Sequence, residues 1–255
     1  MKTITFVRHG ESTANAGGIT MAQAEIPLSE LGTQQAMALA PLLPVKPALI
    51  LTSGYLRTQQ TSKPYCERVG VVATANPLLN EFSTIDPAML VGMNGAQRKP
   101  FVEEYWREPS LTRRMGEHAE TFEEFELRVA AFIPVMDTLP DSTIIFGHGM
   151  WIAMLIWQLM GFSCKDALGM RAFRRFQAGL PMPNCAVYRL IGNGYAWRVQ
   201  ADEAVMQTMR SITVDQAATA SLRKLDNGRT VRIERVTESP DMPLPVFITM
   251  RNEEI

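Results

Sequence analysis

Cysteine is scarce in this sequence and follows no pattern that would staple a fold or hold a metal. The chain of 255 residues has three cysteines, at Cys66, Cys164 and Cys185. Their odd number and wide scatter exclude a disulfide framework, and their spacing matches no common metal motif. We therefore predict free thiols in a reducing compartment.

An excess of charge and long apolar runs are also missing. Lysine and arginine number 25 against 26 acidic residues, the net charge is -1 and the pI is about 6.3, which predicts no broad basic surface for nucleic acid. The most apolar stretch, Met150 to Phe162, is shorter than a membrane span of ~20 residues and contains Gln158, so we expect a core helix and no membrane partner. The opening MKTITFVRHG has no apolar segment of signal-peptide length, which predicts a cytoplasmic protein.

A short apolar segment at the start of the chain leads into polar residues suited to a binding site. Residues 3–7 are β-branched or aromatic, as in a buried strand, and are followed by Arg8, His9 and Gly10. Ligands bind at the carboxyl ends of strands in open α/β sheets. Taken alone, RHG is a weak signal, because a histidine near a strand end is often only packed or solvated.

Two further segments repeat this arrangement. A second expected strand, residues 143–146, is followed by the turn GHG that contains His148 and then by the apolar run. A third, residues 48–52, leads into Ser53 and, one helical turn later, Arg57. Two of the three histidines in the chain thus occupy equivalent strand ends.

These motifs, in this order and at these intervals, resemble those of the histidine phosphatase superfamily, whose fold is called phosphoglycerate-mutase-like. The matching segments are RHGES with Asn15 six residues after His9, PLSELGTQQA (27–36), the turn from Ser53 to Arg57, Asn80 with Glu81, the helix start at 121–129, GHG, and NCAVYRL (184–190). The resemblance implies an α/β fold with three layers, α/β/α, around a mainly parallel central sheet.

The same resemblance implies a division of the chain. Residues 1–200 would form the catalytic domain, and the insertion 82–116 would form a cap over the pocket. Prolines and glycines break any helical period in this insertion, so we expect irregular loops that set specificity. The cations of this insertion could contact an anionic substrate or, equally, form part of a solvated charged surface. They are Arg98, Lys99, Arg107, Arg113 and Arg114.

Residues 201–255 lie outside the resemblance. We expect a short helix at 203–210 and a strand at 230–236 there. Packing on the same chain, a homodimer contact and a cover over the pocket all remain open as the role of this extension.

The matched residues suit phosphoryl transfer. Arg8 and Arg57 offer bidentate, permanently charged donors to phosphate, His148 adds a third donor, and Asn15 and the Gly149 backbone add neutral ones. The amino end of the helix after Gly149 would also point at the pocket.

The resemblance assigns nucleophilic attack to His9, which must be unprotonated to form a phosphohistidine. It assigns protonation of the leaving group to Glu81, whose pKa apolar or anionic surroundings would raise. After Glu81 the sequence FSTID departs from the family's usual continuation with glycine and tryptophan, so Asp86 is the reserve donor.

These assignments predict a metal-independent phosphomonoester hydrolase, without cofactor, that acts on a small phosphorylated metabolite. No cluster of His, Cys, Asp or Glu has metal-ligand spacing. A phosphoglycerate mutase is the alternative within enzymes. It is disfavoured because the family's mutases continue from the donor glutamate into an arginine and a glycine-rich segment that EFSTIDP does not match. A phospho-ligand binder without catalysis is the alternative from another class.

Local patterns predict the remaining elements. A helix should follow an N-cap at Ser29, with Met37 on its apolar side, and another should cover 55–69, bent or shortened by Pro64. A capping box at Thr121 should start a core-facing helix. Also expected are a brief strand at 71–73 and a hairpin of strands 186–190 and 195–199.

Overall fold

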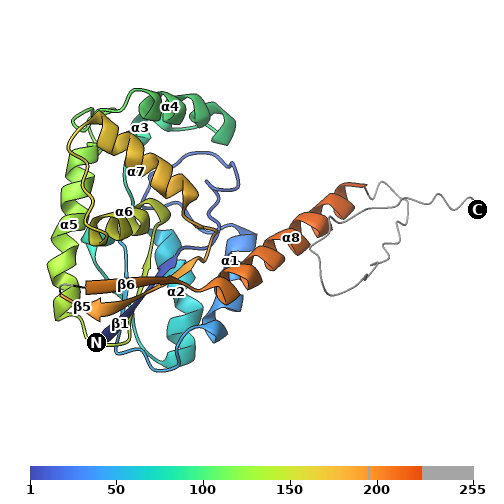
Figure 1. Cartoon of the computed structure of the whole chain (residues 1–255). Coiled ribbons are helices and arrows are strands. Elements are labelled where there is room, and N and C mark those ends of the chain that lie inside the picture. The colour runs from blue at the N-terminus through green and yellow to red at the C-terminus, as the bar shows by residue number, and fades with distance from the viewer. Residues whose placement is uncertain (195, 226–255) are drawn as a thin grey trace, which may run out of the picture. The chain divides into compact units, whose positions relative to one another are not determined.

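The computed structural model describes residues 1–194 and 196–225 of the chain (Figure 1). Residues Met1–Ile212 form one compact unit, and the second unit, Thr213–Ile255, is described only as far as residue 225. The strands are β1 Lys2–Arg8, β2 Leu49–Thr52, β3 Thr74–Ala75, β4 Thr143–Gly147, β5 Val187–Asn193 and β6 Ala196–Ala201. The helices are α1 Glu30–Leu39, α2 Leu56–Val69, α3 Pro87–Leu90, α4 Gly95–Arg107, α5 Phe122–Thr138, α6 Gly149–Leu159, α7 Ala167–Gly179 and α8 Glu203–Leu225, with short 3-10 turns η1 Ala40–Leu42 and η2 Pro77–Leu79.

The strands form one sheet in the order β3-β2-β4-β1-β5-β6. The first four in that order run parallel, and the hairpin β5–β6 continues the sheet antiparallel to β1. The mainly parallel sheet and the hairpin were both predicted and are confirmed. The central strand β4 is buried along its whole length, which explains the three consecutive apolar residues 144–146 in its middle.

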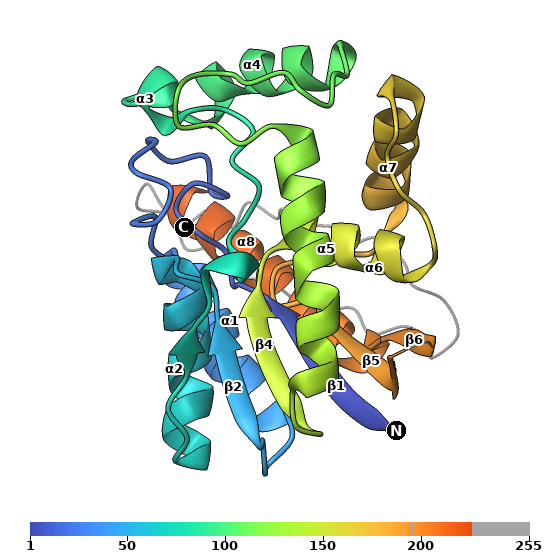
Figure 2. The ribbon, with the colours of Figure 1, turned by 90° about the vertical axis from the view of Figure 1, so that its left-hand side faces the viewer.

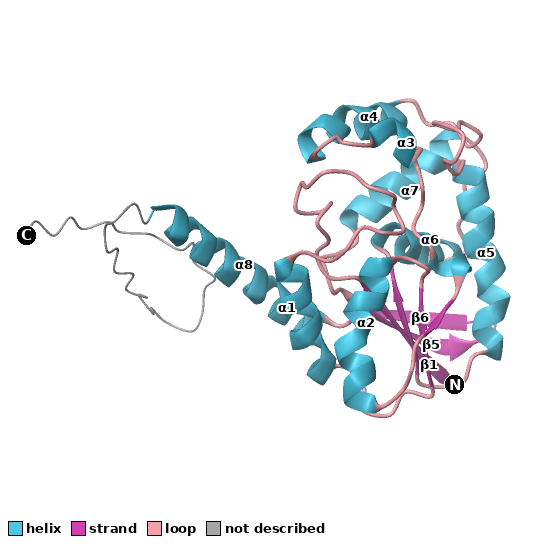
Figure 3. Ribbon diagram, turned by 180° about the vertical axis from the view of Figure 1, so that it is seen from behind, coloured by secondary structure: helices cyan, strands magenta, loops and turns pink. Residues whose placement is uncertain are grey.

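Helices cover both faces of this sheet, so the predicted three layers are present (Figure 3). Ile4 and Phe6 of β1 pack in a core with α5, α6 and α7, whereas Val7 joins a second core with α1 and α2. The alternation follows from the period of two along a strand. At the carboxyl ends of β2 and β4, the helices α3 and α4 form a cap above the sheet (Figure 2).

The helix starts that the sequence predicted are confirmed. Ser29 caps α1 by accepting the Gly32 N–H at 3.0 Å, and Thr121 and Glu124 form the expected capping box of α5. The apolar stripe of α5 is fully buried; it consists of Phe122, Phe125, Val129, Phe132 and Met136.

Other local predictions were wrong. Met37 is 61% exposed, because the buried side of α1 is made by Gly32, Gln35, Ala36 and Leu39, at helical spacing that excludes it. The helix expected over 55–69 is confirmed as α2, Leu56–Val69, and of the two effects expected from Pro64, shortening does not occur. The strand expected at 71–73 lies at Thr74–Ala75 instead. Gly70, in the left-handed conformation, ends α2, and the Val71 N–H still bonds the Cys66 carbonyl, so the chain extends only later.

The cap is more regular than predicted. Asp86 caps α3, with Pro87 at the first helical position, where its missing N–H costs nothing. Asn94 and Gln97 form a capping box for α4, which continues through Pro100. Proline and glycine were therefore misleading as breakers here, because side-chain caps stabilise the helix starts.

The helix α7 was not predicted, and α8 extends beyond the expected 203–210. The predicted strand at 230–236, and Tyr195 in the hairpin, lie outside the described residues. Within the described residues, no helix combines the length and apolar character needed to span a membrane.

Candidate functional site

The carboxyl ends of β1, β4 and β2 bring the predicted residues together. The register pairs Arg8 with Gly147, and beyond it the His9 N–H still bonds the Gly147 carbonyl at 3.0 Å. Ser53 continues β2 in the same way by bonding the Phe146 carbonyl at 3.1 Å. The rings of His9 and His148 consequently lie with their centroids 5.2 Å apart.

Arg57, in the first turn of α2, lies between the two imidazoles. Its Nε donates to His9 Nε2 at 3.2 Å, and its second terminal nitrogen donates to His148 Nδ1 at 3.3 Å. The Gln23 carbonyl accepts from the other terminal nitrogen at 2.8 Å, and the guanidinium lies 4.8 Å from the centre of the Tyr55 ring. The group is thereby held in one orientation.

The hydrogen bonds define the tautomer of His9. Its Nδ1 lies 2.6 Å from the Gly10 carbonyl, which can only accept, so Nδ1 carries the proton. Nε2 therefore has the free electron pair, directed toward Arg57. Burial, reinforced by the charges of Arg57 and Arg8, holds the pKa of His9 well below its usual range, so the ring is neutral.

The proton of His148 is placed by the same reasoning. An arginine can only donate, so Nδ1 accepts and Nε2 donates to Ser53 Oγ at 2.7 Å. Ser53 Oγ also accepts the Tyr55 N–H and lies 2.9 Å from Thr58 Oγ1. Burial, and next the charge of Arg57, lowers the pKa of His148 well below its usual range. His148 is therefore neutral in this arrangement and adds no third positive charge beside the two arginines.

Arg8 is half-buried, and its buried Nε is a donor that is not used. A terminal nitrogen donates to the Met182 carbonyl, whereas Nε has no hydrogen-bond partner among the described residues. Gly149 makes room for this side chain, because a Cβ at that position would lie 3.3 Å from Arg8 Nε. An unpartnered buried guanidinium N–H marks a place suited to an anion.

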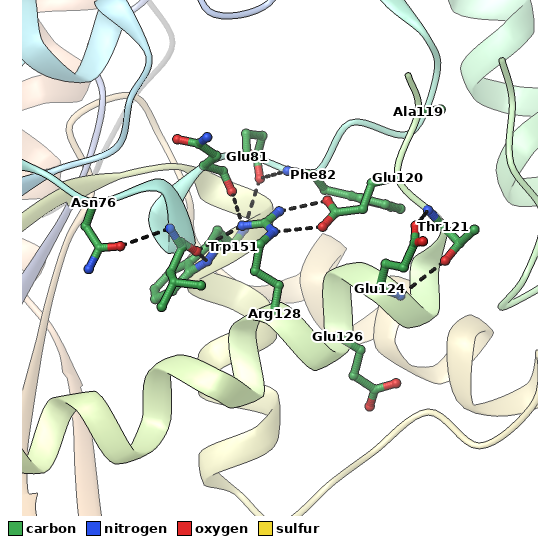
Figure 4. A network of polar contacts seen from close by, with 12 residues as sticks. Asn76, Glu81, Phe82, Ala119, Glu120, Thr121, Glu124, Glu126, Arg128 and Trp151 are labelled. Atoms are coloured by element: carbon green, nitrogen blue, oxygen red, sulfur yellow. Dashed lines mark hydrogen bonds and ion pairs between the residues drawn. The ribbon is translucent and has the colours of Figure 1, made fainter. Parts of the chain in front are cut away.

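Glu81 lies across the amino end of α6. Its two oxygens accept the N–H groups of Met150 at 3.2 Å and Trp151 at 3.1 Å. One of them also accepts the Phe82 N–H at 2.9 Å (Figure 4). The helix end predicted to face phosphate thus gives these two donors to a carboxylate. Burial raises the pKa of Glu81 against the opposing effect of these hydrogen bonds.

Two predicted residues lie apart from this cluster. Asn15 is exposed, and its side chain bonds Ser12 and Asn184, of which Asn184 also donates to the His9 carbonyl. Asp86 accepts the N–H groups of Ala88 and His118, and the bond from His118 is the main cause of its lowered pKa. A carboxylate held ionised in a helix cap does not suit the reserve role of proton donor.

A pocket of about 450 Å³ adjoins Glu81. It is lined by Tyr55, Pro77, Asn80, Glu81, Ser83, Arg114, His118, Ala119, Glu120, Glu124 and Arg128. Of the cap cations singled out in the sequence, only Arg114 lines it. Arg98 instead ties α4 to the carbonyls of Ala14 and Gly18.

Sequence reasoning missed Tyr55 and Arg128. Arg128 forms a two-pronged ion pair with Glu120, both bonds 2.7 Å long, and donates to the Leu78 and Asn80 carbonyls beside Glu81 (Figure 4). The available signal was that Arg128 stands alone next to the apolar stripe of α5. The sequence was read only as predicting a core-facing helix there, so no function was assigned to this arginine. In the part of the chain that the structure describes, no three His, Cys, Asp or Glu side chains gather as a metal site would require.

Known proteins share both the sequence pattern and the fold. A family model described as the histidine phosphatase superfamily, branch 1, matches residues 4–203. The probable phosphoglycerate mutase GpmB of Yersinia pestis (strain Pestoides F) is 27% identical over 201 residues, 74% of this chain and 85% of that protein.

Solved structures agree. A mycobacterial glucosyl-3-phosphoglycerate phosphatase, determined with VO3, is 26% identical with a TM-score of 0.59 and covers 79% of this chain and 98% of its own. The α-ribazole phosphatase of Shigella flexneri has the same fold, at 24% identity and a TM-score of 0.61, over 78% of this chain and 95% of its own. The match of the family model over most of the chain, together with the paired histidines and arginines at the strand ends, shows that the protein belongs to the histidine phosphatase superfamily, branch 1.

Proposed function

We propose that the protein is a phosphomonoester hydrolase that works through a phosphohistidine on His9. The observation that carries this proposal is the Gly10 carbonyl on Nδ1, which leaves Nε2 of a neutral ring as the nucleophile. A second supporting observation is that the solved relative with 26% identity is a phosphatase that binds VO3 and inorganic phosphate.

The two arginines, Arg8 and Arg57, bind the phosphate in this proposal. Arg8 offers its unused Nε, and Arg57 turns donors that now face the imidazoles toward the phosphoryl oxygens. His148 Nδ1 lies beside the same arginine, and the charge of a phosphate dianion favours its protonation, which makes it a third donor. The Gly149 backbone N–H adds a neutral donor at the same site. Asn15 lies apart from it and is linked to it only through Asn184, which donates to the His9 carbonyl. Positioning and charge neutralisation account for most of the catalysis in phosphoryl transfer.

The chemical step then needs one acid. His9 Nε2 attacks phosphorus as the bond to the leaving oxygen breaks, and Glu81 gives that oxygen its proton. In the second half, the Glu81 carboxylate takes a proton from water, the hydroxide attacks phosphorus, and His9 is released as the neutral ring. The raised pKa of Glu81 suits both roles, because the proton is present for the first step and is regained in the second.

The decisive experiment is labelling with a phosphorylated substrate. Acid-labile, base-stable phosphate should appear on His9 and should be absent in His9→Ala, which should also lose turnover while keeping its melting temperature. Retention of more than a few per cent of the activity in His9→Ala would overturn the assignment. A protein that binds the substrate but never becomes labelled would be a phospho-ligand binder.

Phosphoglycerate mutase activity is the second candidate, because curated relatives such as GpmB carry that name. The residues after Glu81 do not favour mutase activity. Phe82 stacks on Phe125 with ring centroids 4.5 Å apart, and Ile85 is buried, so this segment contributes to the core rather than to a sugar-acid contact. Adding 3-phosphoglycerate with a bisphosphate primer separates the two activities: a phosphatase releases inorganic phosphate, and a mutase forms 2-phosphoglycerate.

A further inference from the structure

The pocket beside Glu81 is the place where the leaving group of a phosphate ester would lie. Its lining includes Glu81, which is the proposed acid, and Tyr55. The centroid of the Tyr55 ring lies 5.2 Å from that of His148, so the pocket adjoins the histidine cluster. Its volume of about 450 Å³ is ample for a ring-sized alcohol. Its charges therefore bear on which alcohols are accepted.

The cations of this pocket are already neutralised by the protein. Arg128 is 19% exposed, its Nε and one terminal nitrogen bind both oxygens of Glu120, and the other terminal nitrogen donates to two backbone carbonyls. Arg114 binds Glu124 at 2.5 Å and donates to the Ala119 carbonyl. Two carboxylates thus balance two guanidinium groups, and Glu81 adds a further acidic group when it is ionised.

Apart from the charged residues, the pocket is lined by polar uncharged side chains and by ring surfaces. Asn80 and Ser83 offer an amide and a hydroxyl, the carboxylates accept hydrogen bonds from hydroxyl groups, and Tyr55 and Pro77 present ring surfaces. Such a wall suits an alcohol with several hydroxyl groups. A carboxylate or second phosphate would lie beside Glu120 and Glu124, and the two arginines that line the pocket are already paired with these carboxylates.

We propose, on the basis of the function proposed above, that the substrates are phosphate monoesters of uncharged polyhydroxy alcohols, and that the Arg114–Glu124 and Arg128–Glu120 pairs disfavour leaving groups that carry a second anion. The phosphoryl group itself is bound by Arg8 and Arg57, which do not line this pocket. Specificity thus arises from a repulsive element as well as from hydrogen bonds.

Substrate pairs that differ only in that charge provide the test. Glycerol 3-phosphate and 3-phosphoglycerate differ by a CH2OH group in place of a carboxylate, and glucitol 6-phosphate with 6-phosphogluconate makes a larger pair of the same kind. We expect kcat/KM to favour the uncharged member by about tenfold or more. An equal or higher value for the carboxylate member in both pairs would overturn the proposal.

A variant tests the cause. Glu124→Gln keeps the capping box of α5, which accepts glutamine, but frees Arg114. The preference for the uncharged member should therefore fall severalfold. The matched control is Glu104→Gln, which removes a carboxylate from the Arg113 pair outside the pocket and should leave the preference as it was. An unchanged preference in Glu124→Gln, or an equal fall in the control, would contradict the role of the ion pair.

Hydrolysis of p-nitrophenyl phosphate and labelling of His9, measured in the same preparations, distinguish the two proposals. If both occur while the substrate pairs show no charge preference, only the inference about specificity fails. If neither occurs, the proposed hydrolase function fails and the inference fails with it.

Discussion

Each proposed catalytic side chain owes its protonation state to a specific neighbour. The Gly10 carbonyl fixes the proton of His9 on Nδ1, and burial beside two arginines keeps the ring neutral. Glu81 is the opposite case, because burial favours its protonated form although three N–H groups favour its charge. The pKa of His9 is thus lowered and the pKa of Glu81 is raised, which are the directions that a nucleophilic base and a general acid require.

Glu81→Gln should separate substrates by their leaving group. Loss of a general acid costs about 10²- to 10⁴-fold for an alkoxide that must be protonated. Nitrophenolate departs without a proton, so p-nitrophenyl phosphate should lose much less. Asp86→Asn should show no such contrast, because Asp86 caps α3. Equal losses on both substrates in Glu81→Gln would mean that Glu81 acts through binding or structure.

The pH profile of kcat/KM on an alkyl phosphate should have two limbs. Activity should fall on the acid side as His9 becomes protonated, and this limb should lie below the usual histidine pKa of about 6.5, because the pKa of His9 is lowered. Activity should fall on the alkaline side as Glu81 loses its proton, above the usual glutamate pKa of about 4.3, because the pKa of Glu81 is raised. The alkaline limb should disappear in Glu81→Gln, and its persistence there would assign it to another group.

At the scale of elements, one face of α5 positions the turn before Glu81. Arg128 holds the carbonyls of Leu78 and Asn80, and Glu120 holds Arg128 in place (Figure 4). The same helix buries its apolar stripe in the core, so the position of the turn is coupled to the packing of the sheet.

Arg128→Met should consequently imitate Glu81→Gln in part. We expect about a tenfold loss on alkyl phosphates with a smaller loss on p-nitrophenyl phosphate, because the acid is misplaced rather than removed. The melting temperature should also fall, since Glu120 is left half-buried without its partner. Adding Glu120→Gln to Arg128→Met should recover part of that stability, as coupled partners are not additive. Arg128→Lys, which keeps the charge without the planar fork, should show the same leaving-group contrast as Arg128→Met.

The contact between α1 and the loop after His9 depends on a glycine. A Cβ on Gly32 would lie 1.9 Å from the Glu11 carbonyl oxygen, so Gly32→Ala must push the helix from the loop. We expect a loss of about 1–3 kcal/mol or more in unfolding free energy and a fall in hydrolysis. Gly179→Ala adds the same methyl group where nothing lies within 4 Å, and its stability should not fall. Similar stability in the two variants would contradict this view of the loop.

At the scale of the whole molecule, charge neutralisation at the site is left to arginines. Two arginines and two histidines meet where three strands end, and the carboxylates that a metal would need do not gather among the described residues. We therefore predict that prolonged treatment with a chelator leaves hydrolysis unchanged. Loss of activity that one added divalent metal restores would overturn this prediction.

The sequence alone identified the strand ends, the family and most of the helix starts. These features depend on local physics: β-branched runs favour strands, and Ser29 and Thr121 satisfy the N–H groups within their own first turns. Local reasoning failed where one residue type is compatible with two structural settings. Pro100 lies inside α4 rather than breaking it, and Met37 faces solvent although it is apolar.

Only the tertiary structure decided how the site is charged and oriented. Arg57 meets His9 across 48 residues of sequence and His148 across 91, and Glu81 meets the start of α6 across about 70. The direction of such hydrogen bonds, and the burial that shifts the pKa values of these groups, exist only once distant segments have packed. The amino-acid sequence therefore determined which chemical groups stand at the strand ends, and the packing of the sheet, α5 and α6 determined their protonation states and the pocket that they share.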